Sequence, residues 1–218
     1  MNTEFDEKQE TSIFDEIYKV LLNGIFPSSK SVDIIANDYL QKNETVEKAA
    51  KELIKSEILK YGFWSFIVGI NGMISFPITI FLNLGIVFYI QLRMIGAVAH
   101  MGGFDIKSDQ VRTMFYVCLA ISGVSDILKL TGINAGSKIL KAAINKISGK
   151  TLTLINRKAG FRLLTKFGTK GVINLGALIP IVGGIIGGVT DIILTVIIAK
   201  NAYNVFIKKG SAINKVCR

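Results

Sequence analysis

The stretch YGFWSFIVGINGMISFPITIFLNLGIVFYIQL, residues 61–92, contains no charged side chain. As one straight α-helix it would be about 48 Å long, against a hydrocarbon core of roughly 30 Å, so it is too long for one membrane span and too short for two. Asn71-Gly72 and Pro77 interrupt it, because proline removes a backbone donor and clashes with the preceding helical turn. We therefore predict two packed helices, over 61–70 and 78–100, that form a buried or re-entrant hairpin.

A second apolar run, residues 171–199, has the same outline, with several glycines, a central Pro180 and a single charge at Asp191. Apolar residues at helical spacing fill much of the remaining chain, and alternating polar and apolar strand patterns are missing. The predicted fold class is therefore all-α, a compact helical domain with two Pro/Gly-broken hydrophobic helical hairpins covered by amphipathic helices. We divide the chain into an acidic N-terminal helical extension at 1–44, the helical domain at 45–210 and a short C-terminal tail at 211–218.

Charge is distributed unevenly along the chain. Residues 1–60 hold eight Lys against twelve Asp and Glu, whereas residues 61–218 hold eighteen Lys and Arg against four Asp. Ten basic residues and no acidic residue fall within residues 127–170, which we call the basic stretch. A basic segment between two apolar runs is typical of a protein that works at an anionic lipid surface, where cations gain attraction and apolar area leaves water.

Within the basic stretch, cations alternate with apolar residues in an amphipathic pattern. Each cation near an anionic membrane contributes about 1 kcal/mol, so we predict that these side chains bind lipid headgroups. The pattern also fits a solvated helix face, and it could hold the phosphates of RNA or DNA, although the flanking apolar runs make nucleic acid the least favoured partner. The predicted headgroup-binding residues are Lys138, Lys141, Lys146, Lys150, Arg157, Lys158, Arg162, Lys166 and Lys170.

Arg93 and Asp191 are each the single charged residue of a long apolar segment. A lone charge at bilayer depth costs roughly 3 kcal/mol or more. We therefore predict that the two side chains form a buried charge pair, which removes the penalty of an unpaired charge. In the alternative, both residues lie at helix ends in water.

Four glycines of the second apolar run form two pairs, and the members of each pair are one helical turn apart on adjacent faces. Small residues at this spacing allow close backbone approach between helices, so we predict a helix-packing surface here. Because glycine is also a poor helix former, a flexible turn between Pro180 and Asp191 is an equally good interpretation. The four residues are Gly183, Gly184, Gly187 and Gly188.

Catalytic motifs are scarce. The single His100 excludes a site with two histidines, and no Cys/His metal spacing occurs, so we predict no catalytic residue, no metal and no cofactor. A pairing of Cys118 with His100 and Asp105 can be imagined, and a hydrolase that uses Cys118 or a serine is kept as an alternative.

Two features bear on the compartment. The cysteines, Cys118 and Cys217, have no CxxC spacing, which is typical of a reducing environment. The N-terminus, MNTEFDEKQE, is acidic and has no apolar region, so no signal peptide is predicted. We expect the chain at the cytoplasmic side of the cell membrane.

Over residues 45–207 the chain resembles the EcsC-like family of bacterial proteins. Members of this family are helical, membrane-associated proteins without an established activity, and the family is named after a protein encoded beside an ABC transporter. The resemblance therefore implies a membrane-linked helical protein and supplies no active site. The similarity is carried by IQLRMIGAVAHMGGFD at 90–105, VRTMFYVCLAISG at 111–123 and INRKAGFRLLTKFGTKGVINLGALIPIVGGIIGGVTD at 155–191.

Together these features predict a non-enzymatic protein that docks on, or inserts into, the anionic cytosolic membrane face. The basic stretch would bind headgroups and the apolar hairpins would enter lipid or contact a partner, such as a membrane transporter complex. A soluble carrier that encloses a lipid or another apolar ligand is the first alternative, and a hydrolase of unknown substrate is the second.

Overall fold

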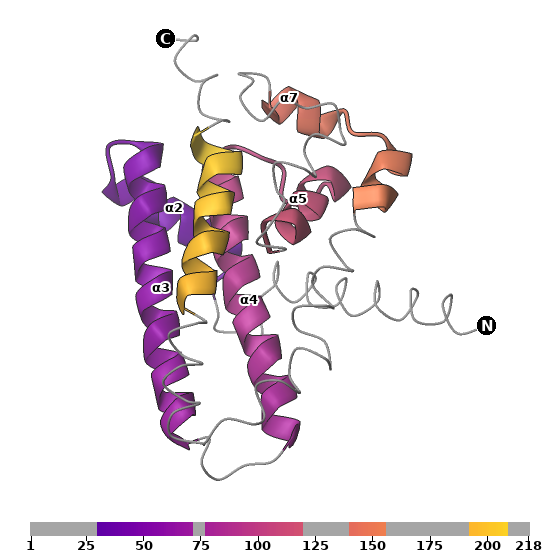
Figure 1. Cartoon of the computed structure of the whole chain (residues 1–218). Helices are drawn as coiled ribbons and strands as arrows, with labels where there is room; N and C mark the ends of the chain where they lie inside the picture. The colour runs from indigo at the N-terminus through magenta and orange to yellow at the C-terminus, as the bar shows by residue number, and fades with distance from the viewer. Residues whose placement is uncertain (1–29, 72–76, 120–139, 156–191, 209–218) are drawn as a thin grey trace, which may run out of the picture.

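Two long antiparallel helices, α3 and α4, form the frame of the molecule (Figure 1). The computed structural model describes residues 30–71, 77–119, 140–155 and 192–208. Its elements are α2 (Val32–Lys42), α3 (Val46–Asn71), α4 (Pro77–Met101), α5 (Asp109–Leu119), α7 (Leu140–Asn145) and the π-helix η2 (Tyr203–Lys208). Residues 149–155 are also helical, and helical residues 192–202 continue directly into η2, so we name the continuous segment the 192–208 helix. All regular structure in the described residues is helical, which confirms the predicted all-α fold class.

The break between α3 and α4 lies where the sequence predicts it, because α3 ends at Asn71 and α4 begins at Pro77. Proline suits the first turn of a helix, where a missing N–H leaves no hydrogen bond unmade. Upstream, α3 already begins at Val46, since the amphipathic turns after Thr45 continue into the apolar stretch without a helix breaker. Among the described residues, no helix meets the length and apolarity that a membrane span requires.

Side-chain caps define where several helices begin. The Thr45 hydroxyl accepts a hydrogen bond from the backbone N–H of Lys48 at 3.2 Å, which caps α3. Ser108 does the same for α5, with its Oγ 3.3 Å from the backbone nitrogen of Val111. At the other end of α4, Gly103 has a φ of 72°, a left-handed conformation that glycine adopts without steric penalty and that commonly ends a helix.

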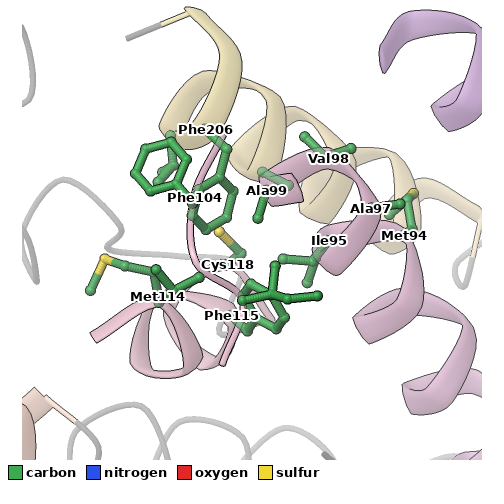
Figure 2. Close-up of a cluster of buried hydrophobic side chains, with 14 of the residues drawn as sticks. Met94, Ile95, Ala97, Val98, Ala99, Phe104, Met114, Phe115, Cys118 and Phe206 are labelled. Carbon is green, nitrogen blue, oxygen red and sulfur yellow. The ribbon is translucent and has the colours of Figure 1, made fainter. Parts of the chain in front are cut away.

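The hydrophobic core surrounds the second half of α4. Apolar residues around most of this half are buried, and Arg93 and His100 lie on a remaining half-buried stripe, so other helices must cover most of its surface. α2, α3, α5 and η2 all pack against α4 (Figure 1). Figure 2 shows this cluster, in which Phe206 makes edge-to-face contacts with Phe104 at 5.0 Å and with Phe115 at 5.9 Å between ring centroids. The buried residues that α4 contributes are Leu92, Met94, Ile95, Ala97, Val98, Ala99 and Met101.

α2 is part of this core although it precedes residue 44, where we place the boundary of the N-terminal extension. Its Val32 and Ala36 are fully buried, and a Val32 methyl lies 3.1 Å from the position that a Cβ on Gly96 of α4 would take. Within the described residues, α2 therefore packs with the helical domain. The division of the whole chain into three parts stays a prediction.

Several predicted elements lie outside the described residues. These are the second apolar hairpin, most of the basic stretch and most of the N-terminal extension.

The contact between Gly102 and η2 leaves no room for a side chain. A Cβ at Gly102 would lie 2.3 Å from the carbonyl oxygen of Phe206, a backbone atom that cannot move without shifting η2. We expect Gly102→Ala to lower the free energy of unfolding by about 1–3 kcal/mol, as overpacked cores do. The measurement is the urea midpoint of the full-length protein.

Gly149→Ala is the matched control, because a Cβ there has nothing within 4 Å and Gly149 lies in a helical segment. Alanine is the better helix former, so this variant should match or exceed the wild-type stability. Equal midpoints for the Gly102 and Gly149 variants would contradict the proposed close packing.

Candidate functional site

An open groove lies between α3 and the 192–208 helix. Its cavity volume is ≈ 370 Å³, and its lining is apolar apart from lysines and one tyrosine at its edge. Ligand pockets commonly measure about 300–1,000 Å³, so the groove reaches the size of a small-ligand site. The lining residues are Lys51, Ile54, Lys55, Ile58 and Leu59 of α3, with Val196, Ala199, Lys200 and Tyr203 of the 192–208 helix.

Helical periodicity explains why these residues share the groove. The lining positions on each helix are separated by three or four residues or are adjacent to such positions, so they fall on one face. The two helices run in opposite directions, because Lys51 meets Tyr203 whereas Gly62, eleven residues later, lies beside Ile192. The groove therefore runs along the helix axes.

Positive charge gathers at one end of the groove. The ammonium of Lys51 lies 5.8 Å from the centroid of the Tyr203 ring, within cation–π range. Burial raises the pKa of the Tyr203 hydroxyl above its usual range, and the nearby Glu47 carboxylate raises it further, so the phenol stays neutral and able to donate a hydrogen bond at physiological pH. Lys55 and Lys200 line the groove from opposite walls, about one helical turn closer to its other end, and both are exposed.

The other end of the groove is apolar and open to solvent. Leu59 is 63% exposed, and Phe63, one turn further along α3, is 68% exposed. Val196 and Ile193 extend this surface on the facing helix, at 44% and 53% exposure. Large apolar side chains that are exposed together mark a surface that meets lipid, a ligand or another protein. We name these four residues the apolar ridge.

A buried polar contact holds the 192–208 helix against α4. Gln91 and Thr195 are 2% and 1% exposed, and the Gln91 amide nitrogen lies 3.0 Å from the Thr195 hydroxyl oxygen. Within the described part of the chain, the Gln91 amide oxygen has no hydrogen-bond partner. Because a buried amide strongly prefers a partner, this contact favours one register of the helix that forms a wall of the groove.

Arg93 has partners close to it in the described residues. Its guanidinium donates hydrogen bonds to the Tyr89 hydroxyl, at 2.5 Å, and to the backbone carbonyl of Lys30, and it also lies over the Tyr89 ring. Asp191 lies outside the described residues, so the predicted Arg93–Asp191 pair stays a prediction.

The four glycines that we expect to pack helices closely also lie outside the described residues. The choice between a helix-packing surface and a flexible turn therefore stays open, and the packing role stays a prediction. These glycines are Gly183, Gly184, Gly187 and Gly188.

The described part of the basic stretch has one buried and one solvated side. Ile144 and Ile147 are buried, whereas Lys146 and Lys150 are exposed, as the amphipathic pattern predicts. In Figure 1, α7 lies at the end of the molecule opposite the ends of α3 and α4 that are joined by residues 72–76. These two lysines therefore lie away from the ends of α3 and α4 at Asn71 and Pro77. The headgroup role of the basic stretch stays a prediction, and Lys138, Arg157, Lys158, Arg162, Lys166 and Lys170 lie outside the described residues.

Cys118 is fully buried in the core (Figure 2). Burial alone strongly raises the pKa of its thiol, which keeps the sulfur protonated and poorly nucleophilic. Among the described residues, no cluster of three His, Cys, Asp or Glu side chains could hold a metal ion. The geometry thus argues against the imagined nucleophile at Cys118.

Searches against protein-family models, curated proteins and solved structures find no match for this chain. The resemblance to the EcsC-like family therefore stays a prediction from the sequence.

Sequence reasoning missed the groove. Helical periodicity on α3 gave a signal, since Lys51, Lys55 and Leu59 recur every four residues. The partner wall at Val196 and Tyr203 lies more than 130 residues away in the chain, and no local pattern connects the two.

We expect Thr195→Val to remove the hydroxyl and leave the Gln91 amide unpaired, which should lower the free energy of unfolding by about 1–3 kcal/mol. The double variant Gln91→Met with Thr195→Val removes both polar groups and should recover most of this loss. Urea titrations of the wild type, both single variants and the double variant give the coupling. Strictly additive losses would contradict the contact.

We expect Cys118 to resist thiol reagents in the folded protein. In a Cys217→Ser background, labelling at pH 8 should proceed only after urea is added, because burial keeps the thiol protonated. The folded state retains this proton above roughly pH 8.5, the ordinary pKa of a thiol, so stability should fall as the pH rises past that value. Stoichiometric labelling of the native protein would instead favour the hydrolase alternative.

Proposed function

We propose that this chain is a non-enzymatic protein that docks on the anionic cytosolic face of a membrane and inserts the end of its α3–α4 hairpin into one leaflet. The observation that supports this most is the charge-free hairpin end, residues 61–71 of α3 and 77–92 of α4. The two segments run side by side and project away from α5 and α7 (Figure 1).

The length of this end matches one leaflet. Lys60 is the last charged residue of α3, and Asn71 lies eleven residues beyond it. At 1.5 Å per residue this distance is about 16 Å, close to half of the roughly 30 Å hydrocarbon core. A hairpin of this depth enters from one side and returns to it, which agrees with the prediction of a re-entrant hairpin.

The surface next to the hairpin end also suits a membrane interface. The apolar ridge lies on both sides of the last charge of α3, Lys60, and the other exposed cations of the two helices near it are Lys55 and Lys200. Lysines at this level place their ammonium groups among headgroups while their methylene stems cover apolar area. Each contributes about 1 kcal/mol at an anionic surface.

Flotation with liposomes tests the proposal. The purified full-length protein should float with vesicles that contain phosphatidylglycerol and remain bound after a high-salt wash, because apolar burial is insensitive to screening. The double variant Leu59→Glu with Phe63→Glu adds two carboxylates to the ridge and should reduce vesicle binding about tenfold or more.

Ile34→Glu is the matched control. Ile34 is an exposed large apolar residue too, at 46%, but it belongs to α2, which does not line the groove. This variant should bind vesicles like the wild type. Equal losses for the ridge variant and the control would refute the orientation, binding that high salt abolishes would refute insertion, and no flotation under any condition would refute membrane docking.

A further inference from the structure

We propose that the groove between α3 and the 192–208 helix holds one acyl chain of an anionic phospholipid, with the headgroup phosphate bound at the lysine end. This inference rests on the proposed function for the source of the lipid, which is the membrane that the hairpin enters. It assigns a single-lipid site that is separate from the hairpin end itself.

The polarity of the groove matches that of a lipid. Lys51 and Tyr203 form one end, with Lys55 and Lys200 on the rim, whereas Leu59 and Val196 form the other end. Between them the lining is apolar apart from the exposed Lys55 and Lys200, so an aliphatic chain that lies against Ile54, Ile58 and Ala199 loses contact with water on that side. The apolar end of the groove is the one nearer the charge-free hairpin end. An acyl chain from the leaflet around the hairpin could therefore enter the groove there.

The dimensions of the groove agree with this occupant. From Lys51 to Leu59 the α3 wall advances eight residues, or about 12 Å, a large part of the roughly 15 Å depth of one leaflet. The base of the groove consists of packed side chains, because Ala199 is buried and Ile54 and Ile58 are half-buried against the core.

Charge complementarity selects an anionic headgroup. Within the described residues, Lys55 and Lys200 make no ion pair, so their charges are available to a ligand. The nearby Glu57 is already paired with Lys60 at 2.8 Å. The neutral Tyr203 hydroxyl adds a hydrogen-bond donor at the same end. A phosphate at this end therefore meets several cations and one donor, against the single nearby carboxylate of Glu47.

The test is calorimetric titration of the full-length protein with a short-chain phosphatidylglycerol below its micelle concentration. Phosphatidylcholine of the same chain length, titrated in parallel, reports the contribution of net headgroup charge. Val196→Trp fills the apolar end with a ring at a half-exposed position that tolerates a larger side chain. It should weaken binding of phosphatidylglycerol about tenfold or more.

Two charge variants test whether the groove lysines bind the headgroup or whether the overall charge of the protein attracts the lipid. The double variant Lys55→Glu with Lys200→Glu should weaken binding of phosphatidylglycerol about tenfold and weaken binding of phosphatidylcholine to a smaller extent, because both lipids carry the phosphate but phosphatidylglycerol alone has a net negative charge. Lys48→Glu is the matched control, because Lys48 is exposed on α3 but does not line the groove, and it should bind both lipids like the wild type.

The outcomes distinguish this site from membrane docking. Val196→Trp should still float with anionic vesicles, since it adds apolar area to the ridge. Wild-type protein that floats but binds no monomeric lipid would overturn the lipid site and leave docking intact. Binding of monomeric lipid without flotation would overturn docking and support a lipid carrier. If Val196→Trp instead dissociates a dimer while lipid binding is unchanged, the occupant is a second copy of the chain and the proposal is wrong.

Discussion

The burial of most of the surface of the second half of α4 is the constraint on which the described structure depends. Apolar residues occupy most of the surface of its second half, with Arg93 and His100 on the remaining stripe, and a helix of this kind is stable in water only when neighbours cover its apolar faces. α2, α3, α5 and η2 supply that cover. This crowding explains the close contacts of Val32 with Gly96 and of the Phe206 backbone with Gly102. Neighbouring elements approach so closely only at positions without a large side chain.

The same two helices continue from this cover into the charge-free hairpin end, whose residues nearest the core, Tyr61, Gln91 and Leu92, are still buried. α3 changes from an amphipathic helix to a uniformly uncharged one after Lys60, and α4 has its first charge at Arg93. A single pair of helices thus has one part that is built into the core and another with the composition of a lipid-facing segment. The groove with its lysine rim lies alongside the transition, where an interface between water and lipid would fall.

Much of the fold could be predicted from local patterns. The helix break follows from Asn71 and Pro77, because proline restricts its own backbone and that of the residue before it. The amphipathic character of the segment around Ile144 and Lys146 was also readable, since helical periodicity separates buried from solvated positions. The candidate site was not readable in this way. Its two walls come from α3 and from a helix more than 130 residues later, and each wall alone is an ordinary helix face.

The sequence by itself determined the helical class, the hairpin break and the separation of charged from uncharged segments, because these follow from backbone sterics, periodicity and solvation within short windows. Only the tertiary structure decided that α2 joins the core, that Cys118 is sealed from solvent and that Lys51 faces Tyr203. Those outcomes depend on which apolar faces cover one another, and the free energy of such packing is shared among distant segments rather than encoded within any one of them.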